Sequence, residues 1–121
     1  MKLAPVSPKP PGKISESELQ KAVIAMAHAR GWLVAHFRPA QVRPGRYVTP
    51  VDADGAGFPD LVMARGERLL FVELKSQKGR LRTEQEVWID ALRCSAPFGT
   101  HEVYVWKPKD WVDGTIDKVL L

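Results

Sequence analysis

Two acidic residues and a lysine, Asp60, Glu73 and Lys75, are the side chains of this sequence best suited to chemistry. Gly66-Glu67 lies midway between the acids and fits a two-residue hairpin loop, because a type II′ turn favours glycine at its first central position. With the turn there, Asp60 faces Glu73, and Lys75 shares their side of the sheet. Cβ atoms of directly opposed residues lie roughly 4.5–5.5 Å apart. The pattern therefore predicts two carboxylates and one ammonium group at the open end of a hairpin.

Two carboxylates at this spacing are costly unless something offsets their repulsion. At about 4 Å they repel by roughly 4 kcal/mol when the effective dielectric constant is about 20. A single divalent metal ion could offset this repulsion, since Mg²⁺ commonly binds one or two carboxylates together with waters and phosphate oxygens. Two alternatives stay open at this point. Either the hairpin end is frayed, with both acids in water and Lys75 in a weak surface pair, or a one-residue slip of the turn moves Asp60 to the opposite face from Glu73.

The strands of this hairpin are apolar on both faces. Residues 61–63 are Leu-Val-Met, and residues 70–72 are Leu-Phe-Val. Such runs are typical of strands in the middle of a sheet that is covered on both sides. Acids at the end of buried strands need a partner, which favours a functional interpretation over a surface ion pair.

A helix is predicted before the hairpin. Ser15, with Glu18 three residues later, forms a capping box. The helix is expected to end at Arg30-Gly31, where glycine suits a left-handed cap, and a strand over residues 32–37 follows. Glu18 has two interpretations: it caps the helix, or it brings a third carboxylate to the acid pair.

A second helix is predicted after the hairpin. Thr83 is expected to cap it, with Glu86 completing another capping box. Its expected apolar face consists of Val87, Trp88, Ala91 and Leu92. Gln85, in the first turn, could share the inward face and contact a metal-bound water, a phosphate or Lys75. A partly exposed position is the alternative for Gln85. A strand is predicted next, over residues 103–106.

Basic residues gather in two connections. Residues 38–57 are rich in proline, glycine and arginine, and Pro44-Gly45 indicates a turn within a short flap hairpin. The side chains there that could contact phosphates or stack on a base or sugar are Arg38, Arg43, Arg46 and Tyr47. The loop after Lys75 carries the denser cluster, formed by Lys78, Arg80 and Arg82. Beside a metal site, this cluster is a candidate contact for the phosphate backbone of DNA. The alternative is a solvated loop in each case or, for residues 38–57, packing against a second subunit.

The whole chain has 121 residues and a formal net charge of +4. We predict a flexible basic tail over residues 1–13 and a single domain over residues 14–121, which ends in a short helix capped by Asp110. No apolar run is long enough to span a membrane. The single cysteine, Cys94, excludes an internal disulfide and a cysteine-based zinc site, so a cytoplasmic location is expected. The basic excess permits an anionic partner such as nucleic acid.

The order of elements and the spacing of the acids resemble the PD-(D/E)XK nuclease superfamily. Pro59-Asp60 is followed on the next strand by Glu73-Leu74-Lys75, within an order of helix, three strands, helix and strand. More narrowly, three motifs resemble the VRR-NUC (virus-type replication-repair nuclease) family: Gly57-Phe58-Pro59-Asp60-Leu61, Glu73-Leu74-Lys75, and Thr83-Glu84-Gln85 leading into Trp88. The resemblance runs from about Glu18 to Trp106. It implies an α/β fold with a restriction-endonuclease-like core (αβββαβ), a mixed central sheet flanked by helices.

The resemblance also implies a role for each matching residue. The expected ligands of Mg²⁺ or Mn²⁺ are Asp60, Glu73, the backbone carbonyl oxygen of Leu74 and, directly or through a water, Glu18. Lys75 would orient or activate the attacking water and stabilise the developing negative charge. Gln85 would support the site.

The activity implied by the resemblance is metal-dependent, structure-selective DNA cleavage in phage or bacterial replication and repair. Some small members resemble Holliday-junction resolvases and act as homodimers, because two strands must be cut symmetrically. Branched or junction-containing DNA and a second copy of the chain are the expected partners, with no nucleotide cofactor and no membrane. Two alternatives stay open. One is a non-catalytic nucleic-acid-binding domain that retains the fold, and the other is a nuclease subunit that needs a partner protein.

Overall fold

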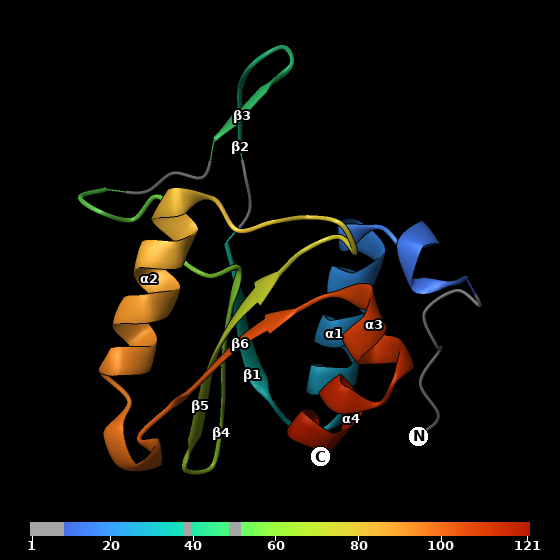
Figure 1. Ribbon diagram of the computed structural model, residues 1–121, viewed down its shortest axis with the longest axis vertical. Coiled ribbons are helices and arrows are strands. Elements are labelled where there is room, and N and C mark those ends of the chain that lie inside the picture. Colours follow the sequence, from blue (N-terminus) through green and yellow to red (C-terminus); the bar gives the residue numbers. More distant parts are fainter. Residues whose placement is uncertain (1–8, 38–39, 49–51) are drawn as a thin grey trace.

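A computed structural model of the chain describes residues 9–37, 40–48 and 52–121, apart from the side chains of residues 40–43, 46–48 and 98 (Figure 1). Arg38, one of the predicted DNA contacts, and the first eight residues of the predicted tail lie outside the described residues. The helices are η1 (Pro11–Lys13), α1 (Glu16–Ala29), α2 (Thr83–Cys94), η2 (Pro97–Gly99), α3 (Pro108–Val112) and α4 (Thr115–Leu120). The strands are β1 (Leu33–His36), β2 (Ala40–Arg43), β3 (Arg46–Val48), β4 (Leu61–Arg65), β5 (Arg68–Leu74) and β6 (Glu102–Trp106).

A four-stranded mixed sheet in the order β1-β4-β5-β6 forms the centre of the fold. β1, β4 and β5 are antiparallel neighbours, whereas β6 runs parallel to β5. Helices α1, α3 and α4 cover one face of the sheet, and α2 lies on the other (Figure 1). The predicted mixed α/β fold, in which helices flank a mixed central sheet, is therefore confirmed.

The hairpin register predicted from the Gly66-Glu67 turn is confirmed. Val62 pairs with Phe71, and Arg65 pairs with Arg68. Gly66 has a φ of 58°, which a residue with a side chain adopts only with strain and glycine adopts freely. The turn thus fixes which side chains of β4 and β5 share a face.

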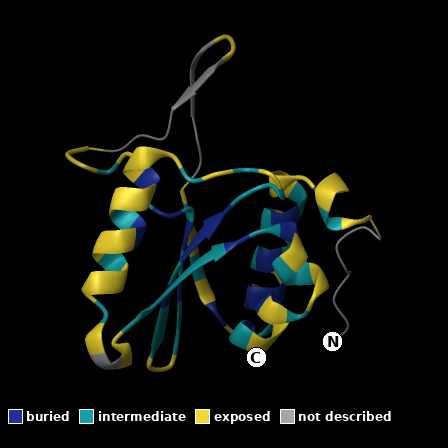
Figure 2. Cartoon of the chain, viewed as in Figure 1, coloured by how far each residue is buried: buried dark blue, intermediate teal, exposed yellow. Residues whose placement is uncertain are grey.

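The main core fills the space between the sheet and α1 (Figure 2). Alternate residues of β4 and β5 point into it: Leu61, Met63, Leu70, Val72 and Leu74. They pack with apolar residues of α1 and α4, which include Leu19, Val23, Ile116 and Leu120. Because side chains alternate along a strand, Glu73 and Phe71 belong to the opposite face, toward α2.

α1 begins as its capping box predicts. The backbone N–H of Glu18 donates to Ser15 Oγ at 3.0 Å, and the Ser15 N–H donates to Glu18 Oε1 at 3.2 Å. The helix passes through Arg30 into Gly31, whose φ is 81°, as the predicted glycine stop requires. The short flap hairpin expected around Pro44-Gly45 is also present, as β2 and β3.

α2 differs from the prediction in its cap and in its buried face. Arg82 is the N-cap residue, so Thr83 lies inside the helix, and the Arg82 N–H donates to Gln85 Oε1 at 2.8 Å. Gln85 and Ile89 are the buried residues of the helix, whereas Val87 is 62% exposed. The sequence carries two apolar stripes at helical spacing, and the helix packs the stripe with Ile89 against the sheet.

The C-terminal region forms two helices where one weak helix was expected. Gly114, with a φ of 84°, separates α3 from α4 and serves as the N-cap of α4. α4 closes one end of the core through Trp32, whose Nε1 donates to Leu120 O at 3.1 Å. Among the described residues, no helix is long and apolar enough to cross a membrane.

Candidate functional site

The acid pair and the lysine meet where β4 begins and β5 ends. The backbone N–H of Leu74 donates to Asp60 Oδ2 at 2.9 Å, which fixes this carboxylate beside the end of β5. The backbone N–H of Lys75 donates to Trp106 O at 3.0 Å, so β6 holds the lysine at the same edge. Glu73, which directly precedes these two anchored residues and lies opposite Asp60 in the β4–β5 register, is only 2% exposed. The frayed-end and slipped-register alternatives are therefore wrong.

Glu73 is held in surroundings that oppose its negative charge. Burial, followed by hydrogen bonding to and repulsion from the Asp60 carboxylate, raises the pKa of Glu73 to about 9. Lys75 acts in the opposite direction but does not compensate. Glu73 Oε2 is buried without a hydrogen-bond partner among the described residues. A buried carboxyl oxygen without a partner is a position where a proton or a cation would lower the free energy.

The donor set fits a small divalent cation. Asp60 and Glu73 offer carboxylate oxygens, and carboxylates, carbonyls and water are the ligands that suit Mg²⁺ and Mn²⁺. Within the described part of the chain, no cluster of three or more His, Cys, Asp or Glu side chains forms a metal site. The ion would therefore complete its shell with water or substrate oxygens, as Mg²⁺ usually does.

The first turn of α1 brings Glu16 toward this pair of acids, while Glu18 is occupied elsewhere. Glu18 caps the helix, and both of its carboxylate oxygens lie 3.1 Å from Lys9 Nζ. Loss of solvation and the charge of Asp60 raise the pKa of Glu16, while Lys75 lowers it. Glu16 also contributes to the raised pKa of Glu73.

Sequence reasoning missed Glu16 because the capping box drew attention to Glu18. The signal was its position as the first residue of the helix, where a side chain leans back beyond the helix end. Of the two interpretations of Glu18, capping is confirmed.

Gln85 is buried, with 7% of its surface exposed, so its predicted place on the inward face is confirmed and the alternative of a partly exposed position is wrong. Its carbonyl oxygen accepts the Arg82 N–H, which leaves the amide NH₂ as its donor group. A fixed amide donor at the start of α2 suits an oxygen of water or phosphate better than it suits the ammonium group of Lys75.

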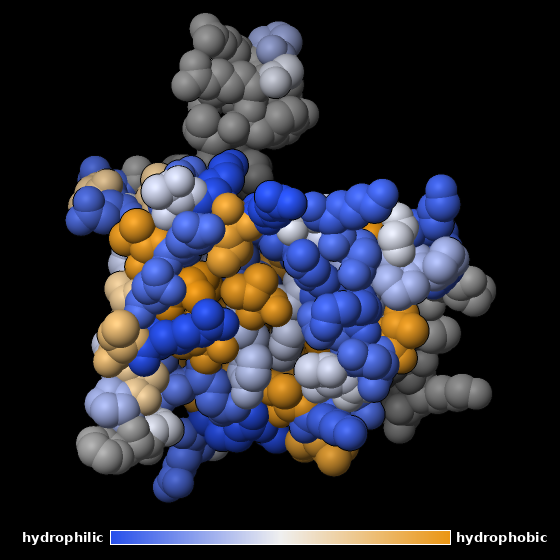
Figure 3. Space-filling model, in the orientation of Figure 1, coloured by the Kyte–Doolittle hydropathy of each residue, from blue (hydrophilic) through white to orange (hydrophobic). Residues whose placement is uncertain are grey.

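Three of the predicted basic residues follow directly on the end of β5. Lys78, Arg80 and Arg82 are exposed on the loop between β5 and α2. Hydrophilic residues line this loop in Figure 3. Arg82 is near enough to Glu16 to lower its pKa, and it forms an ion pair with Glu84 at 3.3 Å. The side chains of the other three candidates, Arg43, Arg46 and Tyr47 on β2 and β3, lie outside the described ones.

Gly57 positions the segment that carries Asp60. Its φ is 85°, and a Cβ atom there would lie 2.5 Å from the backbone carbonyl carbon of Glu84. That contact is with helix backbone, which cannot move aside cheaply. Gly57 therefore allows the chain before Pro59-Asp60 to lie directly against the start of α2, which carries Gln85.

We expect Gly57→Ala to destabilise the protein by about 2–3 kcal/mol, because left-handed strain and a backbone clash act together. Gly12→Ala is the matched control, since its added Cβ meets no atom within 4 Å. Urea unfolding of both variants measures the difference. Equal midpoints for the two variants would show that the close approach of Gly57 to α2 is not tight.

Comparison with protein families gives a match. The VRR-NUC domain family matches residues 47–105. The matched region contains Asp60, Glu73, Lys75 and Gln85 and leaves out α1 with Glu16. The searches of curated proteins and of solved structures gave no match.

Proposed function

Because residues 47–105 belong to the VRR-NUC family, the chain carries a nuclease-type domain, and we propose that it is a metal-dependent DNA endonuclease that hydrolyses phosphodiesters. The observation that carries the proposal is Glu73. It is buried beside the Asp60 carboxylate, its pKa is raised to about 9, and one of its oxygens has no partner among the described residues. Two neighbouring carboxylates, one of them buried, are unfavourable without a compensating charge, and a bound cation would supply that charge.

Asp60, Glu73 and the backbone carbonyl of Leu74 would hold Mg²⁺ or Mn²⁺. When bound, such an ion neutralises the phosphate oxygens and acidifies a water molecule. The Leu74 N–H, which donates to Asp60, orients one of the two carboxylates before any ion arrives. Glu73 lies in β5 and Asp60 directly precedes β4, so two central strands position the pair, and ligands on regular elements are held more precisely than ligands on a loop.

Lys75 supplies positive charge at the same place. Its charge is felt at both Glu73 and Glu16, since it opposes the rise in the pKa of each. Its proposed role is to orient the attacking water and to stabilise the negative charge that develops on the phosphate. The amide of Gln85 would donate to a phosphate oxygen or to a water in the site.

The order α1, β1, β4, β5, α2, β6 supports a PD-(D/E)XK core of the αβββαβ type, with β2 and β3 as an insertion between its first two strands. Lys78, Arg80 and Arg82 would track the phosphate backbone of the DNA. Because one chain carries one such site, symmetric cutting of two strands, as in junction resolution, would take a homodimer.

The test is a cleavage panel of junction, flap and linear duplex DNA with Mg²⁺ or Mn²⁺. We expect the wild type to cut at least one branched substrate and Asp60→Asn to cut none, while both bind DNA. Salt-sensitive binding without cleavage under either metal would instead support a non-catalytic binding domain. Equal cleavage by the two proteins would place the active site elsewhere.

Glu16 and Glu18 offer a matched pair of variants on one helical turn. We propose that Glu16 is the carboxylate of α1 that acts in the site, so Glu16→Ala should lower cleavage by about 10–100-fold, as expected for a residue that supports a metal site. Glu18→Ala should instead destabilise the fold by about 0.5–1 kcal/mol through the lost capping box, with little effect on cleavage. Cleavage rates and urea unfolding, measured for both variants, separate these effects. If Glu18→Ala lowered cleavage and Glu16→Ala did not, Glu18 would be the carboxylate that acts in the site.

A further inference from the structure

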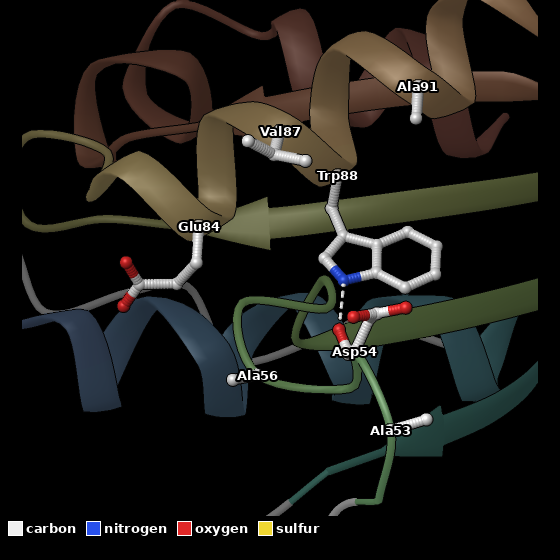
Figure 4. A pocket seen from close by; sticks show the side chains of 7 residues that line it. All are labelled: Ala53, Asp54, Ala56, Glu84, Val87, Trp88 and Ala91. Atoms are coloured by element: carbon white, nitrogen blue, oxygen red, sulfur yellow. Dashed lines mark hydrogen bonds between the residues drawn. The ribbon is translucent and has the colours of Figure 1, made fainter.

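α2 leaves an apolar stripe uncovered on its outer side. Val87 is 62% exposed, and Ala91, one turn later, is also exposed. Helical spacing alone predicts that Val87 and Ala91 belong to the buried apolar face of the helix. In the structure, Ile89 is buried against the sheet instead. The stripe faces Ala53 and Ala56 of the preceding loop, and together they line a hollow of about 460 Å³ (Figure 4).

Contacts within the protein hold the walls of the hollow in place. Trp88 Nε1 donates to Asp54 O at 2.7 Å, which ties the loop to the helix, as Figure 4 shows. Phe58 packs edge-on against Trp88 with ring centroids 4.9 Å apart. Gly57 adds the close approach to the backbone of Glu84. The surface is therefore shaped by contacts that do not depend on an occupant.

The surroundings of the hollow are acidic, in contrast to the net charge of +4 of the whole chain. Asp54 and Glu84 line it. Residues 52–57 and α2 together contain five acidic side chains and one arginine: Asp52, Asp54, Glu84, Glu86, Asp90 and Arg93. Such a surface repels the phosphates of DNA, so nucleic acid is a poor occupant. A second copy placed symmetrically would bring the same acids against each other, which is also unfavourable.

We propose that this hollow docks a segment of a partner protein that carries an aliphatic or aromatic anchor between lysines or arginines. The anchor would fill the apolar space between Val87, Ala53 and the Trp88 ring. The flanking cations would pair with Asp54 and compete with Arg82 for Glu84. A buried anchor inside a charged rim is the usual anatomy of such sites.

Docking there would contact the two segments that lead into the proposed nuclease site. Residues 52–58 run into Asp60, and the first turn of α2 carries Gln85. An occupant would hold both segments in place, and cleavage would then rise when the partner binds. This last consequence rests on the proposed function, whereas the docking itself does not.

The experiment is selection of short random peptides displayed on phage against the wild-type protein, with no DNA present. The enriched peptides should share a large apolar residue beside lysine or arginine. Fluorescence anisotropy should then show binding at least tenfold weaker to Val87→Lys. Val112→Lys is the matched control, because Val112 is also exposed, at 56%, but lies on α3. In NMR spectra, the Trp88 indole N–H signal should shift when a selected peptide is added.

Three outcomes would overturn the proposal. The first is the absence of an enriched class, and the second is equal binding to both valine variants. The third is a wild-type dimer that Val87→Lys dissociates in sedimentation, since the occupant would then be a second copy. None of these readouts involves cleavage, so a failure here is distinguishable from a failure of the nuclease proposal.

Discussion

Replacing Lys75 with alanine is expected to lower DNA cleavage by about 10²–10³-fold, the usual loss when one preorganised charge-stabilising group is removed. Lys75 lies at the end of β5, where its backbone is fixed by β6 and its charge acts on both Glu73 and Glu16. The variant should keep its fold, because its backbone hydrogen bond to Trp106 does not involve the side chain. Single-turnover cleavage with saturating protein measures the chemical step alone.

Lys78→Ala is the control for Lys75→Ala. Lys78 is exposed three residues later on the same loop, so it changes the net charge equally. We expect this variant to bind DNA modestly more weakly and to have the same single-turnover rate. The slope of log K for DNA binding against log salt concentration should fall in magnitude by about one. If both variants lost only binding, Lys75 would be a phosphate contact and not a catalytic residue.

Glu73→Gln should abolish cleavage and yet stabilise the metal-free protein. The pKa of Glu73 rises from the ordinary 4.5 to about 9, so between these pH values the folded chain holds a proton that the unfolded chain has lost. Stability therefore falls as pH rises through this window, by up to about 1.4 kcal/mol per pH unit. The amide stays neutral, which removes the slope, so the stability advantage of the variant over the wild type should grow as the pH rises across this window.

Urea unfolding in the presence of EDTA, at pH values across the window, measures this effect. Glu86→Gln, on the exposed side of α2, is the control and should keep the wild-type slope. Adding Mg²⁺ should stabilise the wild type and not Glu73→Gln, since only the former has the site to bind it. A Glu73→Gln variant that is less stable than the wild type at every pH would mean that the carboxylate is structural.

The part of the fold closest to the site was predictable because it depends on local rules. One glycine at the Gly66-Glu67 turn fixed the pairing of β4 with β5, and this pairing alone set Asp60 and Glu73 on one face. The capping box of Ser15 likewise fixed the start of α1. Both signals act within a few residues, so they depend little on how distant segments pack.

The remaining features depend on contacts between distant segments. Whether Glu16 or Glu18 is directed toward the acid pair depends on the orientation of α1 relative to the sheet. That orientation cannot be predicted from helical spacing. The side of α2 that becomes buried was ambiguous because two apolar stripes share the helix, and Gln85 follows the stripe with Ile89 into the interior. Packing of Arg65 over Trp32, with 4.5 Å from its guanidinium carbon to the ring centroid, has no local signal.

The most direct measurement of the central claim is a Mn²⁺ titration of the protein without DNA, followed by electron paramagnetic resonance of the free ion. Wild-type protein should remove Mn²⁺ from solution at a specific site, and Asp60→Asn and Glu73→Gln should each lose that site while remaining folded. If both variants take up Mn²⁺ as the wild type does, or if the wild type takes up none, the carboxylates at the end of β5 do not form a metal centre.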